Sequence, residues 1–223
     1  MKVGREKLKI LAVSDMHGQL EPVHRLVAEH TPDLLLCCGD WGDPGEVLEE
    51  DLLSLQEQTY ILTVFGNHDD RDLLARLRNR DGSPILLEQG ELREVGGLHL
   101  AGISGIWAKS HRRPHYVTEE DVAAFVERLQ GQPLEVLLTH GCPVGLADRT
   151  PRGTHGGKRC FLHAFRTLAP QVHLCGHLHL QQQYQTKSGQ IVLNIGYTAA
   201  GDYALLWARA GTIALEFAGR WSP

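Results

Sequence analysis

The chain has 223 residues, of which 42% are hydrophobic, so it can bury one sizeable core but is short for two independent domains. We therefore expect a single domain over residues 1–223. The formal charge of −5 argues against a long nucleic-acid surface, because affinity for a phosphate backbone comes from clustered lysine and arginine. A small or locally recognised partner fits this composition better.

The first residues and the cysteines indicate where the protein acts. Residues 1–9 carry several charges, and the apolar run that follows is too short for a signal peptide or a membrane span. We therefore expect a cytoplasmic protein that does not bind membranes. The five cysteines have no C-x-x-C spacing, which disfavours a disulfide framework and a thiolate metal site. Most of them are expected to be buried, reduced thiols.

The first half of the chain alternates strand and helix signals. Short apolar runs at 10–13, 34–36 and 61–65 predict buried strands. Apolar residues with helical spacing follow these runs, over residues 22–30, 47–55 and 73–77. The order predicts a βαβαβ beginning.

The next part continues with the same two signals. Residues 98–103 predict a strand, and residues 118–129 predict a helix in which Thr118 and Asp121 form a capping box. Further strands are expected at 136–138 and 172–175, separated by a helix over 161–168. Strand signals therefore outnumber helix signals in this part.

The end of the chain lacks helix-length gaps. Strand-like runs at 190–195, 203–208 and 212–217 are separated only by glycine or polar turns. Neighbouring strands joined by short turns pair antiparallel, so we expect antiparallel pairing here and a mixed sheet in the whole domain.

Five polar blocks follow directly on five of the apolar runs. They are D-x-H at residues 15–17, G-D at 39–40, G-N-H-D at 66–69, T-H at 139–140 and G-H-x-H at 176–179. A buried strand therefore delivers each block to one rim of the fold. Each motif alone is a weak signal, but five together predict a metal site.

The residue types in the blocks indicate which metals are bound. Aspartate, asparagine and histidine are ligands for Mn, Fe, Zn or similar divalent ions. Two ions about 3.5–4 Å apart need a bridging group, and Asp40 is the natural candidate. Residues two apart, as in D-x-H and G-H-x-H, project to one side in extended backbone. The glycines at 39, 66 and 176 permit close approach of the backbone.

The blocks resemble the pattern of the calcineurin-like metallophosphoesterase superfamily, which is D-x-H, G-D-x-x-D, G-N-H-[D/E], H and G-H-x-H. Every element of that pattern is present between Asp15 and His179. The resemblance implies an α/β fold with two packed mixed β-sheets flanked by helices, a four-layer αββα arrangement. It also implies a metal-dependent hydrolase.

The resemblance further implies two divalent ions, most simply Mn²⁺, with Fe, Zn or other ions as alternatives. One ion would be held by Asp15, His17, Asp40 and His179. The other would be held by Asp40, Asn67, His140 and His177.

His68 joins neither ligand set in this resemblance, which implies instead that it acts as the general acid that protonates the leaving oxygen, or that it stabilises that oxygen as imidazolium. Asp43 matches the second aspartate of G-D-x-x-D and is expected to accept a hydrogen bond from His68. The implied reaction is in-line attack on phosphorus by a hydroxide shared between the two ions.

One departure from the family pattern bears on the substrate. Phosphoprotein phosphatases of the superfamily carry an arginine after the second aspartate, which clamps a dianionic monoester, whereas this chain has Pro44. We therefore expect a small phosphodiester substrate. The short length and the glycine-rich stretches at 102–105 and 154–157 resemble the small Icc-related phosphoesterases, whose relatives include cyclic-nucleotide phosphodiesterases.

Two irregular segments, 104–116 and 142–159, are expected to lie beside the site and to affect specificity. His155 in the second segment is a candidate for phosphate contact. Candidates in the first are His111, Arg112, Arg113 and His115, with Trp107 or Tyr116 stacking on a base. A solvated charged loop is the alternative.

Arg71, after the third block, is expected to pair with Asp70 or Asp72 rather than to touch substrate. Other functions remain open. They are a phosphomonoesterase or protein phosphatase, a nuclease, and an inactive scaffold that recruits partners. The sequence does not decide whether the chain forms a homo-oligomer.

Overall fold

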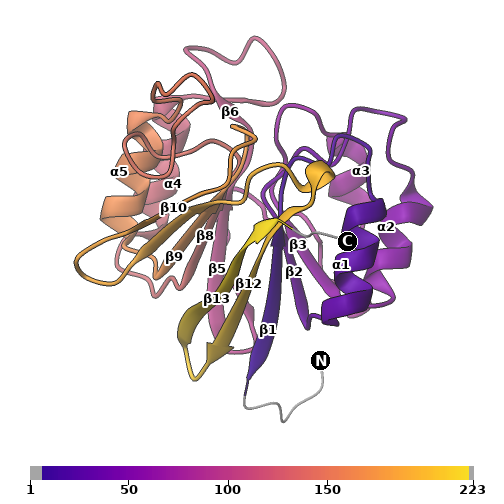
Figure 1. Ribbon diagram of the computed structural model, residues 1–223. Coiled ribbons are helices and arrows are strands. Elements are labelled where there is room, and N and C mark those ends of the chain that lie inside the picture. Colours follow the sequence, from indigo (N-terminus) through magenta and orange to yellow (C-terminus); the bar gives the residue numbers. More distant parts are fainter. Residues whose placement is uncertain (1–6, 221–223) are drawn as a thin grey trace.

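Two mixed β-sheets pack face to face between two layers of helices in the computed structural model, which describes residues 7–220 (Figure 1). The first sheet has the order β13-β12-β1-β2-β3. Its strands are β1 (Leu8–Val13), β2 (Leu34–Cys37), β3 (Tyr60–Thr63), β12 (Asp202–Arg209) and β13 (Thr212–Arg220).

The second sheet has the order β10-β11-β9-β8-β5-β4. Its strands are β4 (Arg93–Val95), β5 (Leu98–Ile103), β8 (Val136–Thr139), β9 (Val172–Cys175), β10 (Gln182–Gln185) and β11 (Ile191–Asn194). The helices are α1 (Glu21–His30), α2 (Glu49–Gln56) and α3 (Arg71–Arg76) beside the first sheet, and α4 (Glu119–Leu129) and α5 (Arg159–Leu168) beside the second.

Alternation along each strand explains the continuous apolar runs. In β1, Ile10 and Ala12 point to the layer between the sheets, whereas Leu11 and Val13 point to the helices. A strand that is covered on both faces needs apolar residues at every position. The result is the predicted arrangement of two packed mixed sheets flanked by helices.

Most predicted elements are confirmed within a few residues. β1, β2 and β3 run parallel and are joined by α1 and α2, as the βαβαβ prediction requires. The capping box of α4 is also present, because the Thr118 N–H donates to the Asp121 carboxylate at 2.8 Å.

The prediction for the end of the chain was partly wrong. β12 and β13 pair antiparallel as expected, but β11 joins the other sheet, parallel to β9 and antiparallel to β10. All four residues of β11 are buried, which suits a strand between two neighbours. The unpredicted β10 is polar and mostly exposed, so it carries no apolar alternation.

The cysteines are buried and form no disulfide within residues 7–220, as predicted. In that same part of the chain, no helix has both the length and the apolar character needed to span a bilayer.

The topology brings the polar blocks to one rim. β1, β2 and β3 run parallel in the first sheet, and β8 and β9 run parallel in the second. Parallel strands end at the same edge, and each of these five strands is followed by one block. The residues of the blocks thus meet where the two sheets end together.

Candidate metal centre

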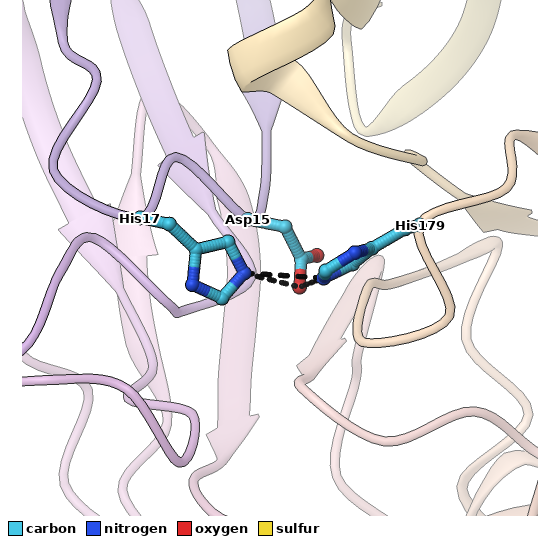
Figure 2. A group of neighbouring side chains, drawn as sticks. All are labelled: Asp15, His17 and His179. Atoms are coloured by element: carbon cyan, nitrogen blue, oxygen red, sulfur yellow. Dashed lines mark hydrogen bonds and ion pairs between the residues drawn. The ribbon is translucent and has the colours of Figure 1, made fainter.

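Asp15 lies between histidines from both sheets (Figure 2). The Nε2 atom of His179 is 3.1 Å from Asp15 Oδ1 and 3.1 Å from the Nε2 atom of His17. His17 Nε2 is also 3.9 Å from Asp15 Oδ1. Two imidazole nitrogens and a carboxylate oxygen that face one point are a ligand set for a divalent cation.

A second group shares Asp15 and adds Asp40 and His140, all of them buried. The Oδ2 atom of Asp40 is 3.3 Å from His140 Nε2 and 3.8 Å from His17 Nε2. Asp40 therefore reaches both groups, as the bridging role requires. These two groups within residues 7–220 contain no cysteine.

Several polar atoms in this centre lack a well-aligned hydrogen-bond partner. These buried polar atoms are Asp15 Oδ1, Asn67 Oδ1 and His140 Nε2. Buried polar atoms without a partner are destabilising in a folded protein. A cation would satisfy all three, so the residues present fit the divalent ions that the resemblance implies.

Hydrogen bonds orient the ligands. His140 Nδ1 donates to the backbone carbonyl of Cys38 at 2.8 Å, which leaves Nε2 directed at Asp40. Asp15 Oδ2 accepts from the Ser14 hydroxyl at 2.5 Å and from the His177 N–H at 2.9 Å. The ligands are thereby fixed before any ion arrives.

Charge in the centre favours a cation. Burial would lower the pKa of His140, but the carboxylates of Asp40 and Asp15 raise it to about 10. Burial and the neighbouring His140 lower the pKa of His177 to about 4, so its imidazole is neutral near pH 7 and available as a ligand. The His140 and His177 rings are 5.0 Å apart. Metal binding would displace protons, and its affinity is expected to fall as the pH falls.

The backbone of the ligands differs from the sequence-based expectation. Asp15, His17, His177 and His179 were expected in extended backbone, but their φ angles lie between 47° and 71°. Asp40 has a φ of 59°. L-residues rarely adopt this left-handed conformation, and it persists where the surroundings enforce it, often at functional sites. The side chains converge through tight turns rather than through strand alternation.

The glycines of the blocks allow close approach, as predicted. A Cβ atom on Gly39 would lie 2.5 Å from the Gly66 nitrogen, and one on Gly176 would lie 1.9 Å from the Ser14 hydroxyl. No side chain fits at either position.

Asp69 is a residue whose role the sequence did not reveal. Its carboxylate accepts backbone N–H bonds from Gly66 at 2.6 Å, Asp40 at 2.7 Å and Trp41 at 2.8 Å. It therefore ties the turn that carries Asp40 to the turn that carries Asn67. The only sequence signal for this role is the aspartate that follows the asparagine and histidine of the third block.

Asp69→Asn is expected to loosen that connection. The amide would turn one NH₂ group toward a backbone N–H, which leaves a donor unpaired and lowers the free energy of unfolding by about 2 kcal/mol. Mn²⁺ affinity should fall about 10- to 100-fold, as for other groups that orient metal ligands. Urea denaturation and metal titration check the two effects; unchanged Mn²⁺ affinity would contradict the role.

His68 and Asp43 lie at the exposed side of the centre. His68 Nδ1 is 3.1 Å from Asp43 Oδ2, and the His68 ring is 5.1 Å from the His17 ring. The backbone N–H of His68 donates to Asp40 Oδ1 at 2.7 Å. The structure thus contains the contact expected between these two residues, next to the ligand set.

The candidates for substrate contact have different surroundings. His111 Nε2 is 2.6 Å from Asp121 at the start of α4, and His155 Nδ1 is 2.7 Å from the buried Asp148. Arg112 and Arg113 are exposed. His111 and His155 are thus oriented by carboxylates of the protein itself.

Two further residues near the centre make contacts that the sequence did not indicate. The Tyr197 ring stacks on His179, with centroids 4.7 Å apart and an interplanar angle of 14°. Arg71 forms no ion pair with Asp70 or Asp72, contrary to expectation, because its guanidinium lies over the Phe65 ring and donates to the Pro114 carbonyl. Asp70 instead caps α3.

Comparison with known proteins identifies the family. The profile described as calcineurin-like phosphoesterase matches residues 8–181. The chain belongs to this family. Calcineurin-like phosphoesterases generally depend on two metal ions, in keeping with the ligand groups around Asp15 and Asp40.

The relatives of this calcineurin-like phosphoesterase include an uncharacterised protein and an enzyme. An uncharacterised protein of Methanocaldococcus jannaschii is 24% identical over 84% of this chain and 87% of its own length. The lariat debranching enzyme of Arabidopsis thaliana is 26% identical over 63% of this chain, which spans 44% of that enzyme.

A solved structure of a Thermus thermophilus protein has the same fold, with a TM-score of 0.69, 16% identity, and coverage of 96% of this chain and 98% of that chain. A Plasmodium protein described as the anchor in the inner membrane complex reaches a TM-score of 0.59 at 10% identity, with 96% and 88% covered. These likenesses concern the fold alone.

Proposed function

We propose that this calcineurin-like phosphoesterase is a phosphodiesterase that uses two divalent ions, Mn²⁺ by preference, to hydrolyse a small phosphodiester such as a cyclic nucleotide. The observation that carries the proposal is the position of Asp40 Oδ2, within 4 Å of histidines from both ligand groups. The oxygen and nitrogen donors suit Mn²⁺, Fe or Zn rather than a metal selected by thiolates.

The proposed ligand sets are those of the family pattern. Asp15, His17, Asp40 and His179 would hold one ion, and Asp40, Asn67, His140 and His177 the other. When bound, the ions supply an activated water and positive charge against the phosphoryl oxygens.

Two residues of the chain, His68 and Asp43, would supply the proton that the leaving group needs. Asp43 contacts His68 Nδ1, which orients the ring and leaves Nε2 to face the leaving group as the proton donor. The His68 side chain is 45% exposed, so a substrate can reach it. His68 would donate that proton to the leaving oxygen as the bond to phosphorus breaks.

His68→Gln is expected to have an effect that depends on the leaving group. For a diester with a poor, alkoxide-like leaving group, kcat should fall about 100-fold, because general acid catalysis contributes about 10²–10⁴-fold. For bis(p-nitrophenyl) phosphate the loss should be smaller, because nitrophenolate leaves without a proton. Steady-state kinetics over a series of aryl diesters checks this; an equal loss for all leaving groups would contradict the acid role.

Pro44 supports a diester over a monoester. It follows Asp43 directly and has no side-chain donor for the second charge of a phosphate monoester. Protein metal-stripped and reloaded with Mn²⁺ is expected to hydrolyse bis(p-nitrophenyl) phosphate at least about tenfold faster than p-nitrophenyl phosphate, a margin of about 1.4 kcal/mol. The reverse preference would favour a phosphomonoesterase. A panel of 2′,3′- and 3′,5′-cyclic nucleotides then narrows the substrate.

A nucleic-acid diester is the second candidate, favoured by the similarity to a lariat debranching enzyme. The net charge of −5 opposes it, because a strand would need a basic surface along its backbone. Degradation of single-stranded RNA or DNA at moderate salt would support this alternative. A protein that binds Mn²⁺ and hydrolyses no phosphoester would instead act as a scaffold.

A further inference from the structure

Residues 105–117 form a loop next to the segment that leads into the third block, and we call them the 105–117 loop. Two short parallel strands close its base, β6 (Ile106–Trp107) and β7 (Tyr116–Val117). The Ile106 N–H donates to the His115 carbonyl at 3.0 Å, and the Ala108 N–H donates to the Val117 carbonyl at 2.9 Å. The two ends of the loop are therefore held together by backbone hydrogen bonds.

The loop is joined to the segment that carries Asn67 and His68. The Gly105 N–H donates to the Phe65 carbonyl at 2.6 Å, and the Phe65 N–H donates to the Ser104 hydroxyl at 3.2 Å. Gly105 has a φ of +86°, and a Cβ there would lie 2.4 Å from the His115 carbonyl oxygen. Only glycine allows the loop to fold back this closely.

Arg71 makes a further contact to the returning part of the loop. Its guanidinium lies 4.5 Å from the centroid of the Phe65 ring, and its Nη1 donates to the Pro114 carbonyl at 2.5 Å. Arginine can lie over an aromatic ring and still donate hydrogen bonds in the plane of its own guanidinium group, which lysine cannot do. Arg71 thus connects Phe65, which precedes the third block, with the residue before His115.

This contact fixes the backbone next to His115, at the end of the loop that is bonded to the segment leading into the third block. His115 is half-buried, and the charged groups that act on it are Asp40, His68, Arg71 and Arg113. Burial and the nearby cations lower the pKa of His115, with Asp40 opposing them. His115 is therefore a neutral hydrogen-bond donor near pH 7, in the part of the loop that is bonded to the segment carrying Asn67 and His68.

We propose that His115 contacts the phosphoryl or leaving-group oxygens of the substrate and that Arg71 is a positioning residue, which holds His115 there through Pro114. The inference rests on the proposed phosphodiesterase function and adds a specificity residue to it. A neutral donor suits a phosphodiester, which carries one negative charge, better than a dianionic monoester.

A double-mutant cycle tests the dependence of one residue on the other. His115→Ala and Arg71→Met are each expected to lower kcat/KM for bis(p-nitrophenyl) phosphate about tenfold, and the double variant should lose no more than the worse single variant. Mn²⁺ affinity should stay within about twofold throughout. Independent losses that multiply to about a hundredfold would overturn the positioning role, and unchanged kinetics in His115→Ala would overturn the contact.

Hydrogen exchange provides a readout that does not depend on the substrate. Arg71→Met should speed exchange of the Ile106 and Ala108 amides about tenfold, with α4 unchanged. Arg76→Met is the matched control, since Arg76 lies on the same helix and pairs with Glu49 at the surface. It should change neither kinetics nor exchange. Absent diester turnover in the wild type would refute the proposed function, whereas unchanged loop exchange in Arg71→Met would refute this inference.

Discussion

Asp40→Asn is expected to lower hydrolysis of bis(p-nitrophenyl) phosphate by at least about 10³-fold. The substitution removes the negative charge that faces both His17 and His140. Loss of a shared ligand charge weakens metal-derived stabilisation by several kcal/mol, and about 1.36 kcal/mol corresponds to a tenfold change in rate. The amide oxygen of asparagine still accepts the His68 N–H, so the local backbone is kept.

Metal content measured beside the kinetics distinguishes a lost ion from a damaged fold. The variant should bind fewer than two Mn²⁺ ions per chain and unfold no earlier than the metal-free wild type. Asp72→Asn is a matched control, because Asp72 is exposed in the first turn of α3 and belongs to none of the blocks. Full metal content with full activity in Asp40→Asn would remove Asp40 from the centre.

Gly66→Ala is expected to damage the centre almost as severely. A Cβ atom at this position would lie 2.1 Å from Asp40 Oδ1 and 2.7 Å from the His140 ring. Both side chains are buried and hydrogen-bonded, so neither can move away freely. A displacement of about 1 Å can lower a rate about 10²-fold, and two displaced ligands should lower kcat/KM about 10³-fold. Overpacking should also destabilise the fold by about 1–3 kcal/mol.

Gly82→Ala is the control for the alanine substitution itself. Gly82 has a φ of +83° with nothing within 4 Å of a built Cβ, so its replacement adds backbone strain of about 1 kcal/mol without a clash. The comparison uses kcat/KM, Mn²⁺ titration and urea denaturation. If Gly66→Ala binds two ions as tightly as Gly82→Ala, the close approach at Gly66 does not shape the centre.

The sequence was sufficient to predict the ligand-bearing strands because each one is buried on both faces. That burial requires an unbroken apolar run, and the polar block after it is conspicuous for the same reason. The contact between His68 and Asp43 was likewise expected, through the family pattern. The helix at 119–129 was readable from its capping box, since both cap residues are local in sequence.

Other features depend on contacts between distant parts of the chain. The left-handed backbone at Asp15 and His177 is imposed by hydrogen bonds between turns of different sheets, such as the His177 N–H to Asp15. β11 belongs to the second sheet because it pairs with β9, and the apolar run of residues 190–195 gives no sign of that pairing. Arg71 was expected to pair with nearby aspartates because no local signal points to Pro114, 43 residues away.

The most direct test of the central claim is a titration of metal-free protein with Mn²⁺, following bound metal and hydrolysis of bis(p-nitrophenyl) phosphate in the same samples. Two ions per chain are expected, with activity appearing as the second ion binds. Full activity with a single ion, or two bound ions without hydrolysis of any phosphoester, would contradict a two-metal phosphodiesterase.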